Sequence, residues 1–587
     1  MLRVLRMTAC TAALLSPCFL LSQTQASQDT PSAPVVRPTS AKAKPADSGK
    51  AADKTPKLTD DQKLALALLE TSEAASRGFE APMRSFSLMN VAQSLTATDQ
   101  ARARSVLRDA FTASLEIHDD DDTKSRLQQE IFRTLLPLSQ EDVEELLPQA
   151  EMSVRRPITN VIVGRYAEKK QFDKGLELVN QISALDEFPY ASGGKLMEAM
   201  PPEMMAEKQG LFSQALSSFK AHPREPNRIT LGDDSLAGLV VKFGTTMPPK
   251  MVLAAIDEVL SQDKKLVDDQ LNITVGGDGG TASFASRYQY DLFAVLPVLR
   301  QLDESRAKQL LEENQSLQDQ LQKYPQGLSS LDPPPPPTPP GAPKDANSNR
   351  RGLSTMVRRG GPPGAGPAPA GAAAQSNAAA QAYMEQEGVR RAKEIAQEGE
   401  TDPTQAIAHA MTLPLTLSNT GRNSPRAGAL EAIAKANVKK NPGASSQALS
   451  ELRKTAGDLK LGLQAQYLSS AADIYLQMGD KDNAEKIVGA GFKIAEKLLD
   501  NDLNPDNPNQ ALKAWWPSAD AYRRFVEVQT KISHPMALNV LKEIKDPEIR
   551  ATESIMVARS LLGLPLKRFM VAEHRKDMNM MMMTDSN

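Results

Sequence analysis

The stretch that decides the fold is residues 465–498, AQYLSSAADIYLQMGDKDNAEKIVGAGFKIAEKL. Small or apolar residues recur in it at positions i, i+3, i+4 and i+7, which places them on one face of an α-helix. The period occurs once on each side of Gly479, in Leu468, Ala471, Ala472 and Tyr475 and again in Ala484, Ile487, Val488 and Gly491. The stretch therefore predicts two amphipathic helices joined by a tight polar turn.

The same period recurs elsewhere in the chain. It occurs in Phe172, Gly175, Leu176 and Val179 and in Ala537, Val540, Leu541 and Ile544, and Leu64, Ala67, Leu68 and Ala75 share one helix face after the helix-capping candidate Thr59. The best strand candidate, Leu271–Val275, is short and has no set of alternating β-branched runs around it. Aromatic residues make up only 4% of the chain, so Ala, Leu, Ile and Val must build the core. These features predict an all-α fold.

Several segments share one design, in which an amphipathic helix and a polar turn precede a second helix that opens with a small residue. Nine positions separate Tyr166 from Gly175, and nine separate Tyr475 from Ala484. Related helix openings follow Asp402-Pro403 and His534-Pro535, where proline suits a first helical turn because its missing N–H would have no partner there. First-helix patterns recur at 426–434 and 550–558.

Across residues 465–498 these spacings resemble a tetratricopeptide repeat, a helix–turn–helix unit of about 34 residues. The resemblance is looser across 155–185 and 518–545, the repeats are irregularly spaced, and the best unit lacks the terminal proline. The chain is therefore similar to degenerate tetratricopeptide-like α-solenoids. The resemblance implies stacked antiparallel helix pairs with a concave face that binds a partner. An irregular helical bundle without a groove is the alternative.

The N-terminus has the pattern of a cleavable export signal. Arg3 and Arg6 precede an apolar stretch, Met7–Leu21, and small residues occupy the cleavage positions Thr24 and Ala26. The apolar stretch is shorter than the roughly 20 residues that span a membrane. Both cysteines would leave with the signal, which removes disulfides, thiolate metal sites and cysteine nucleophiles from the mature chain. The loss of two arginines changes the formal net charge from −3 to −5, which gives no support to nucleic acid binding.

Composition divides the chain into six segments. We predict an all-α protein, an irregular α-solenoid in two bodies joined by a disordered linker. The segments are a signal peptide (1–26), a disordered spacer (27–57), an N-terminal helical repeat-like domain (58–325), a Pro/Gly/Ala-rich disordered linker (326–375), a C-terminal tetratricopeptide-like domain (376–570) and a disordered tail (571–587).

Three patterns are candidates for chemistry, and each has a simpler explanation. The glycine-rich segment Val275–Thr281 lacks the Lys-Ser/Thr of a nucleotide loop, so we expect a flexible connection before a helix over 286–302. Asp119–Asp122 with Glu130 resemble half of a calcium loop, but Lys124 occupies the position where an EF-hand has glycine, which favours helix capping. Five histidines, His118, His222, His409, His534 and His574, have no zinc-site spacing.

The linker contains Pro333–Pro340, which predicts a short polyproline II rod, and the basic pairs Arg350-Arg351 and Arg358-Arg359. A solvated spacer is the expected role, with weak contact to anionic envelope polymer or lipid as the alternative.

We therefore predict an exported scaffold that binds proteins in a bacterial periplasm or envelope, or outside the cell. The prediction includes no enzymatic activity, no cofactor, no nucleic acid partner and no transmembrane segment in the mature chain. The sequence assigns no catalytic, cofactor-binding or metal residue. A factor that binds or processes cell-wall polymer and a structural protein without a dedicated ligand remain as alternatives.

Overall fold

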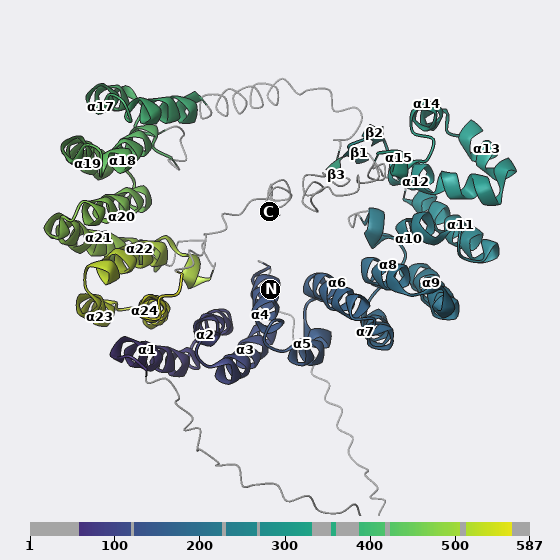
Figure 1. Ribbon diagram of the computed structural model, residues 1–587, viewed down its shortest axis with the longest axis horizontal. Helices are drawn as coiled ribbons and strands as arrows, with labels where there is room; N and C mark the ends of the chain where they lie inside the picture. Colours follow the sequence, from purple (N-terminus) through teal and green to yellow (C-terminus); the bar gives the residue numbers. More distant parts are fainter. Residues whose placement is uncertain are drawn as a thin grey trace, which may run out of the picture. The chain divides into compact units, whose positions relative to one another are not determined.

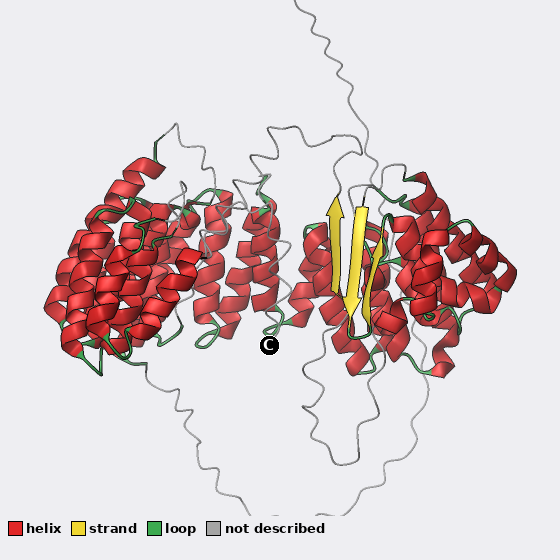
Figure 2. Cartoon of the chain, turned by 90° about the horizontal axis from the view of Figure 1, so that it is seen from above, coloured by secondary structure: helices red, strands yellow, loops and turns green. Residues whose placement is uncertain are grey.

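The computed structural model describes residues 58–118, 122–225, 230–266, 271–331, 354–359, 387–416, 423–504 and 512–565 (Figure 1). The predicted signal peptide, spacer and tail, and most of the predicted linker, lie outside these ranges. Across the ranges the structure is built from helices with one small sheet, which confirms the predicted all-α class (Figure 2). Within the same ranges, no helix is both long and apolar enough to cross a membrane.

The helices before the linker are short to medium in length. They are α1 (Asp60–Ser76), α2 (Ala81–Leu95), α3 (Gln100–Leu115), α4 (Thr123–Leu135), α5 (Gln140–Leu146), α6 (Met152–Glu168), α7 (Phe172–Leu185), α8 (Tyr190–Ala199), α9 (Met205–Ala221), α10 (Leu236–Phe243), α11 (Pro249–Lys265), α12 (Arg287–Leu302), α13 (Glu304–Glu312), α14 (Gln315–Lys323) and α15 (Leu328–Leu331).

The helices after the linker begin with one at residues 387–398. The others are α17 (Pro403–Thr412), α18 (Pro425–Asn437), α19 (Pro442–Gly457), α20 (Leu461–Gln477), α21 (Lys481–Asp502), α22 (Pro517–Ile532), α23 (His534–Glu543) and α24 (Pro547–Leu561), with a 3-10 turn, η5 (Lys513–Trp515), before α22. The helix starts predicted near Pro403 and Pro535 are confirmed by α17 and α23.

The two predicted polar turns have the same backbone geometry. Gly479, between α20 and α21, has a φ of 81°, and Lys170, between α6 and α7, has a φ of 56°. Each lies four residues after a tyrosine whose carbonyl oxygen accepts from the N–H five residues on, at 2.9 Å for Tyr475 and 2.8 Å for Tyr166. The left-handed residue ends the first helix and turns the chain into the second.

Alternate helices contact one another in an ordered row. In the C-terminal segment α18 contacts α20, α20 contacts α22, and α22 contacts α24; in the N-terminal segment the same rule links α2, α4, α6, α8, α10 and α12. We call these helices the even row. Each also packs on the odd-numbered helix that follows it, as α20 does on α21 and α6 on α7. Because an even-row helix contacts both its even-numbered neighbours and an odd-numbered helix, many of its side chains are buried, and α2 has no exposed residue.

The row continues from the end of the chain to its beginning. Helix α24 packs on α1, which takes the place of the odd-numbered partner that would follow it, and α24 also contacts α2 (Figure 1). Ser72 Oγ of α1 lies 3.5 Å from the carbonyl oxygen of Ala551, and Arg559 Nη1 donates to Ser94 Oγ of α2 at 3.2 Å. One helix pair is thus assembled from opposite ends of the sequence.

The buried face of α1 differs from the prediction. Thr59 forms the expected cap, because its Oγ1 accepts from Gln62 N at 3.2 Å. The buried residues, however, are Ala65, Leu69, Ser72 and Ser76, whereas the predicted Leu64 and Leu68 are half-buried and Ala67 and Ala75 are exposed. The face that packs on α24 is made partly of serine. Serine is small enough to permit close helix contact, but a search for apolar periodicity does not detect it because it is polar.

The sheet has three antiparallel strands in the order β2-β1-β3 (Figure 2). They are β1 (Leu271–Gly277), β2 (Gly280–Phe284) and β3 (Ser354–Arg359). Leu271, Ile273 and Val275 are buried on one face, as expected for a strand with one face on the core. Two parts of the segment predicted as a linker therefore carry regular structure, α15 and β3. The sequence did not predict either element, because both segments contain few apolar residues. The backbone hydrogen bonds of β3 come from its pairing with β1.

Candidate functional site

The glycine-rich segment is a hairpin turn, so the predicted flexible connection is wrong. Gly277 of β1 pairs with Gly280 of β2, whose φ of 134° is accessible to glycine. Gly279 N donates to the carbonyl oxygen of Leu331 at 2.8 Å, and a Cβ at Gly279 would lie 2.1 Å from the carbonyl oxygen of Ser330. The glycines therefore allow a close backbone approach to α15. The helix predicted to follow is confirmed by α12.

The described residues of the acidic run and the described histidines are not brought together as a metal site, and His574 lies outside the described ranges. Residues 119–121 lie outside the described ranges, and Asp122, which precedes α4, makes no side-chain capping bond there, contrary to the expected role. Among the residues that the structure describes, no three His, Cys, Asp or Glu side chains are close enough to hold a metal ion. His409 Nδ1 lies 2.9 Å from Glu398, and His222 Nδ1 lies 2.9 Å from its own helix carbonyl at Ser218.

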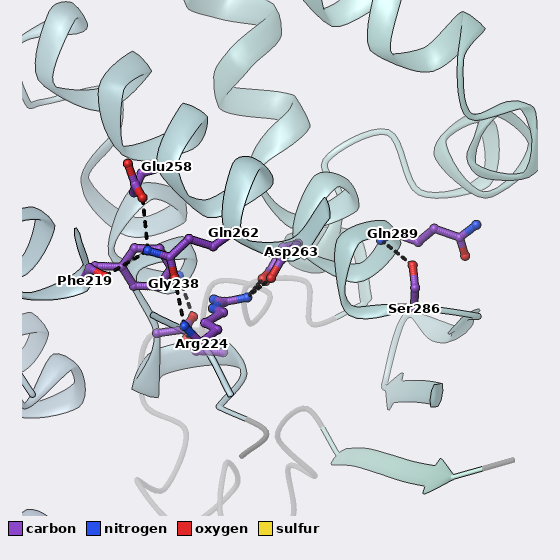
Figure 3. A network of polar contacts seen from close by, with 11 residues as sticks. Phe219, Arg224, Gly238, Glu258, Gln262, Asp263, Ser286 and Gln289 are labelled. Carbon is purple, nitrogen blue, oxygen red and sulfur yellow. Dashed lines mark hydrogen bonds and ion pairs between the residues drawn. The ribbon is translucent and has the colours of Figure 1, made fainter. Parts of the chain in front are cut away.

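The structure instead gathers charged residues inside the N-terminal segment (Figure 3). Arg224 follows α9 and inserts its guanidinium between Asp263 of α11 and Asp291 of α12. Nη1 lies 2.6 Å from Asp263 Oδ1 and also bonds Asp291. The two aspartate side chains are 0% exposed and the arginine side chain 5%. We call Arg224, Asp263 and Asp291 the buried charge cluster. Arg287, one helical turn before Asp291 in α12, is also fully buried.

Gln262 fixes the position of the loop that carries Arg224. Its Oε1 accepts from Arg224 N at 3.1 Å, while its Nε2 donates to the carbonyl oxygen of Phe219 and to Glu258, each at 3.0 Å (Figure 3). The Arg224 guanidinium also lies 5.1 Å from the centre of the Phe219 ring, a cation–π distance. These contacts tie the end of α9 to α11 and α12.

The electrostatics of the cluster favour a structural role. Burial and, to a smaller extent, the neighbouring Asp291 raise the pKa of Asp263 to about 8 against the opposing effect of Arg224. A raised carboxyl pKa is a common feature of general acids. A general acid must reach its substrate, however, and both carboxyl groups here have no exposed surface. The arrangement can hold three helices together, and it offers no surface for a reaction.

A second buried charge lies in the C-terminal segment. Glu553 of α24 is 0% exposed, and neither of its carboxylate oxygens has a hydrogen-bond partner among the described residues. Arg523 Nε of α22 lies 3.9 Å from Oε1 of Glu553, and Nη2 of the same arginine donates to the carbonyl oxygen of Ala514 at 2.9 Å. Burial raises the pKa of Glu553 to about 8. Glu553 lies in the helix that packs on α1, two residues after Ala551.

The hairpin carries a shallow, open depression of about 370 Å³. Its lining residues are Leu271, Asn272, Ser283, Phe284 and Ala285. Only Asn272 and Ser283 among them offer side-chain hydrogen bonds, and none carries a charge. The depression can receive part of a peptide or a small apolar group. None of its lining residues is an acid or a base, and the hydroxyl of Ser283 lies 3.1 Å from that of Thr274, which cannot activate it as a base would.

Sequence reasoning missed the buried charges, although a signal for them exists. Asp291 interrupts the stretch Tyr290-Asp-Leu-Phe-Ala-Val-Leu, and Glu553 and Arg559 flank Ile-Met-Val in α24. A charge in a helix that has no polar face has to be buried with a partner. No family model matches the chain, and no curated protein matches its sequence.

Proposed function

We propose that the chain is an exported helical-repeat scaffold that binds other proteins in a bacterial envelope or periplasm, and that it is not an enzyme. One observation carries the proposal, namely the even row with its ordered partner helices. Repeated helix pairs in which each contacts its neighbours give an extended surface, which is how α-solenoids bind partners. The tetratricopeptide-like turns at Lys170 and Gly479 support the same assignment.

The export signal would bring this surface to partners outside the cytoplasm. The rival, a factor that acts on cell-wall glycan, calls for two carboxylates in a cleft roughly 5 to 10 Å apart. Asp263 and Asp291 are buried around an arginine and are closed to a glycan, and the surface carboxylates Asp142 and Glu145 are both bonded to Arg108. Their placement favours the scaffold over the rival.

The experiment is affinity capture from a periplasmic extract with residues 27–587 as bait, followed by a direct binding assay with each captured protein. Two exposed apolar residues give matched variants. Val161 lies on α6 of the even row and is 45% exposed, and Met536 lies on the odd-numbered helix α23 and is 41% exposed. Val161→Asp should weaken binding if the even row forms the binding surface, and Met536→Asp should leave it unchanged.

The outcomes separate the candidates. Purified proteins that bind the bait at micromolar concentration, and less tightly to Val161→Asp, support the scaffold. Enrichment of glycan without protein would favour the polymer-binding rival, and equal losses for the two variants would remove the even row as the binding surface.

A further inference from the structure

The β1–β2 hairpin is anchored to the helices that surround it. Tyr324 Oη accepts from Thr281 N and donates to the carbonyl oxygen of Thr281, each at 3.1 Å. The turn bonds α15 through Gly279, and Phe284 packs against Phe293 of α12 with ring centres 5.0 Å apart. Both strands also contact α12 and α15. The hairpin is therefore a fixed part of the N-terminal segment.

Strand β3 is added to this hairpin from far along the chain. It pairs antiparallel with β1 in six residue pairs, from Leu271↔Arg359 to Gly276↔Ser354. In sequence, the nearest described residue before β3 is Leu331 and the nearest after it is Glu387. Successive side chains of β3 lie on opposite faces of the sheet: Val357 is half-buried beside Ile273, and Met356 on the other face is 45% exposed.

The ladder hydrogen bonds of this pairing do not by themselves offset the cost of ordering β3. Six paired residues make about six ladder hydrogen bonds, each worth a net of roughly 1 kcal/mol. Fixing the backbone of six residues costs roughly 1–2 kcal/mol each, so the bonds alone do not hold the strand. The remaining stabilisation has to come from the inner face. There Thr355, a polar residue, lies opposite Val275, which is only 1% exposed.

We propose that the edge of β1 is a binding site for an extended segment of another protein, and that β3 occupies it in the free chain. A sheet edge binds such a segment by backbone hydrogen bonds and reads alternate side chains. The register defines the partner: aliphatic β-branched residues at the positions of Thr355 and Val357, opposite Val275 and Ile273. A segment with valine in place of Thr355 buries more apolar surface than β3 does, and therefore competes with it for the edge of β1. This site is separate from the even-row surface proposed above.

The test uses the full mature chain and labelled peptides. One peptide carries residues 352–361, a second has valine at the Thr355 position, and a third is scrambled. Val357→Asp places a charge against Ile273 and should release β3, whereas Met356→Asp changes the exposed face and is the matched control. The valine peptide should bind Val357→Asp at least tenfold more tightly than it binds wild type or Met356→Asp. The scrambled peptide should bind none of them.

Amide hydrogen exchange gives a second measurement that does not depend on one variant. Exchange across Leu271–Gly277 should rise in Val357→Asp, and in a chain whose Ser354–Arg359 is replaced by Gly/Ser, and should fall again when the valine peptide is added. Equal affinity of the peptide for Val357→Asp and Met356→Asp would overturn the proposal, as would unchanged exchange. A wild-type dimer that the peptide dissociates would show that β3 of a second copy fills the edge, and would overturn the assignment to a different protein.

Discussion

Replacing Glu553 by glutamine should stabilise the C-terminal segment at neutral and alkaline pH and leave it almost unchanged at pH 5. Glu553 is completely buried, and its closest cation, Arg523, is 3.9 Å away and bonded to Ala514. Burial raises the pKa of the carboxyl from its ordinary 4.5 to about 8. Glutamine has nearly the same shape as the protonated acid and does not titrate, so it isolates the charge.

The sign and size follow from linkage. Below pH 4.5 the carboxyl is protonated in both the folded and the unfolded chain, so its titration does not affect stability. As the pH rises toward 8, the unfolded chain releases this proton and the folded chain keeps it, which lowers the free energy of unfolding by about 1.4 kcal/mol per pH unit. Between pH 5 and 8 the loss is on the order of 4 kcal/mol, and Glu553→Gln should remove it.

The chain contains its own probe for this measurement. Its two tryptophans, Trp515 and Trp516, lie at η5 and the start of α22, and η5 contacts α24. Urea unfolding followed by tryptophan fluorescence at several pH values reports on this segment. Glu496→Gln is the control, because hydrogen bonding to Lys545 on the surface lowers the pKa of Glu496 and gives the opposite sign. Parallel pH curves for wild type and Glu553→Gln, or a variant less stable at pH 8, would refute the reasoning.

Three further predictions concern the turns, the hairpin and the N-terminus. Gly479→Ala should destabilise the chain by about 1 kcal/mol because the residue is left-handed, and Lys170→Gly should be neutral or stabilising by up to about 1 kcal/mol, both measured by urea unfolding. Tyr324→Phe removes two bonds to Thr281 and should cost about 1–2 kcal/mol, with faster amide exchange in the hairpin. Mass spectrometry of the exported protein should find a mature chain that begins at Ser27.

Local features of this fold were predictable, and those that join distant residues were not. The helices on both sides of Gly479 follow from a period of 3.6, and the turn geometry follows from the residues in it. The packing of α24 on α1 joins residues almost five hundred positions apart, and no local pattern marks it. Strand β3 lies in a segment rich in Pro and Gly, where composition favours disorder. Only its pairing with β1 makes it a strand.

The buried charges have a common cause in the arrangement of the even row. A helix at the edge of a bundle has a solvent face for its charged residues, but α12 and α24 contact helices on several sides and have almost none. Asp291 in α12 and Glu553 in α24 therefore point into the protein, where an arginine has to accompany each. An arginine between two carboxylates bonds both, as Arg224 does, whereas Arg523 leaves Glu553 without a hydrogen bond. The two sites should consequently respond differently to loss of charge: removing the carboxylate of Asp291 leaves a buried arginine with one partner fewer, and removing that of Glu553 relieves an unsatisfied group.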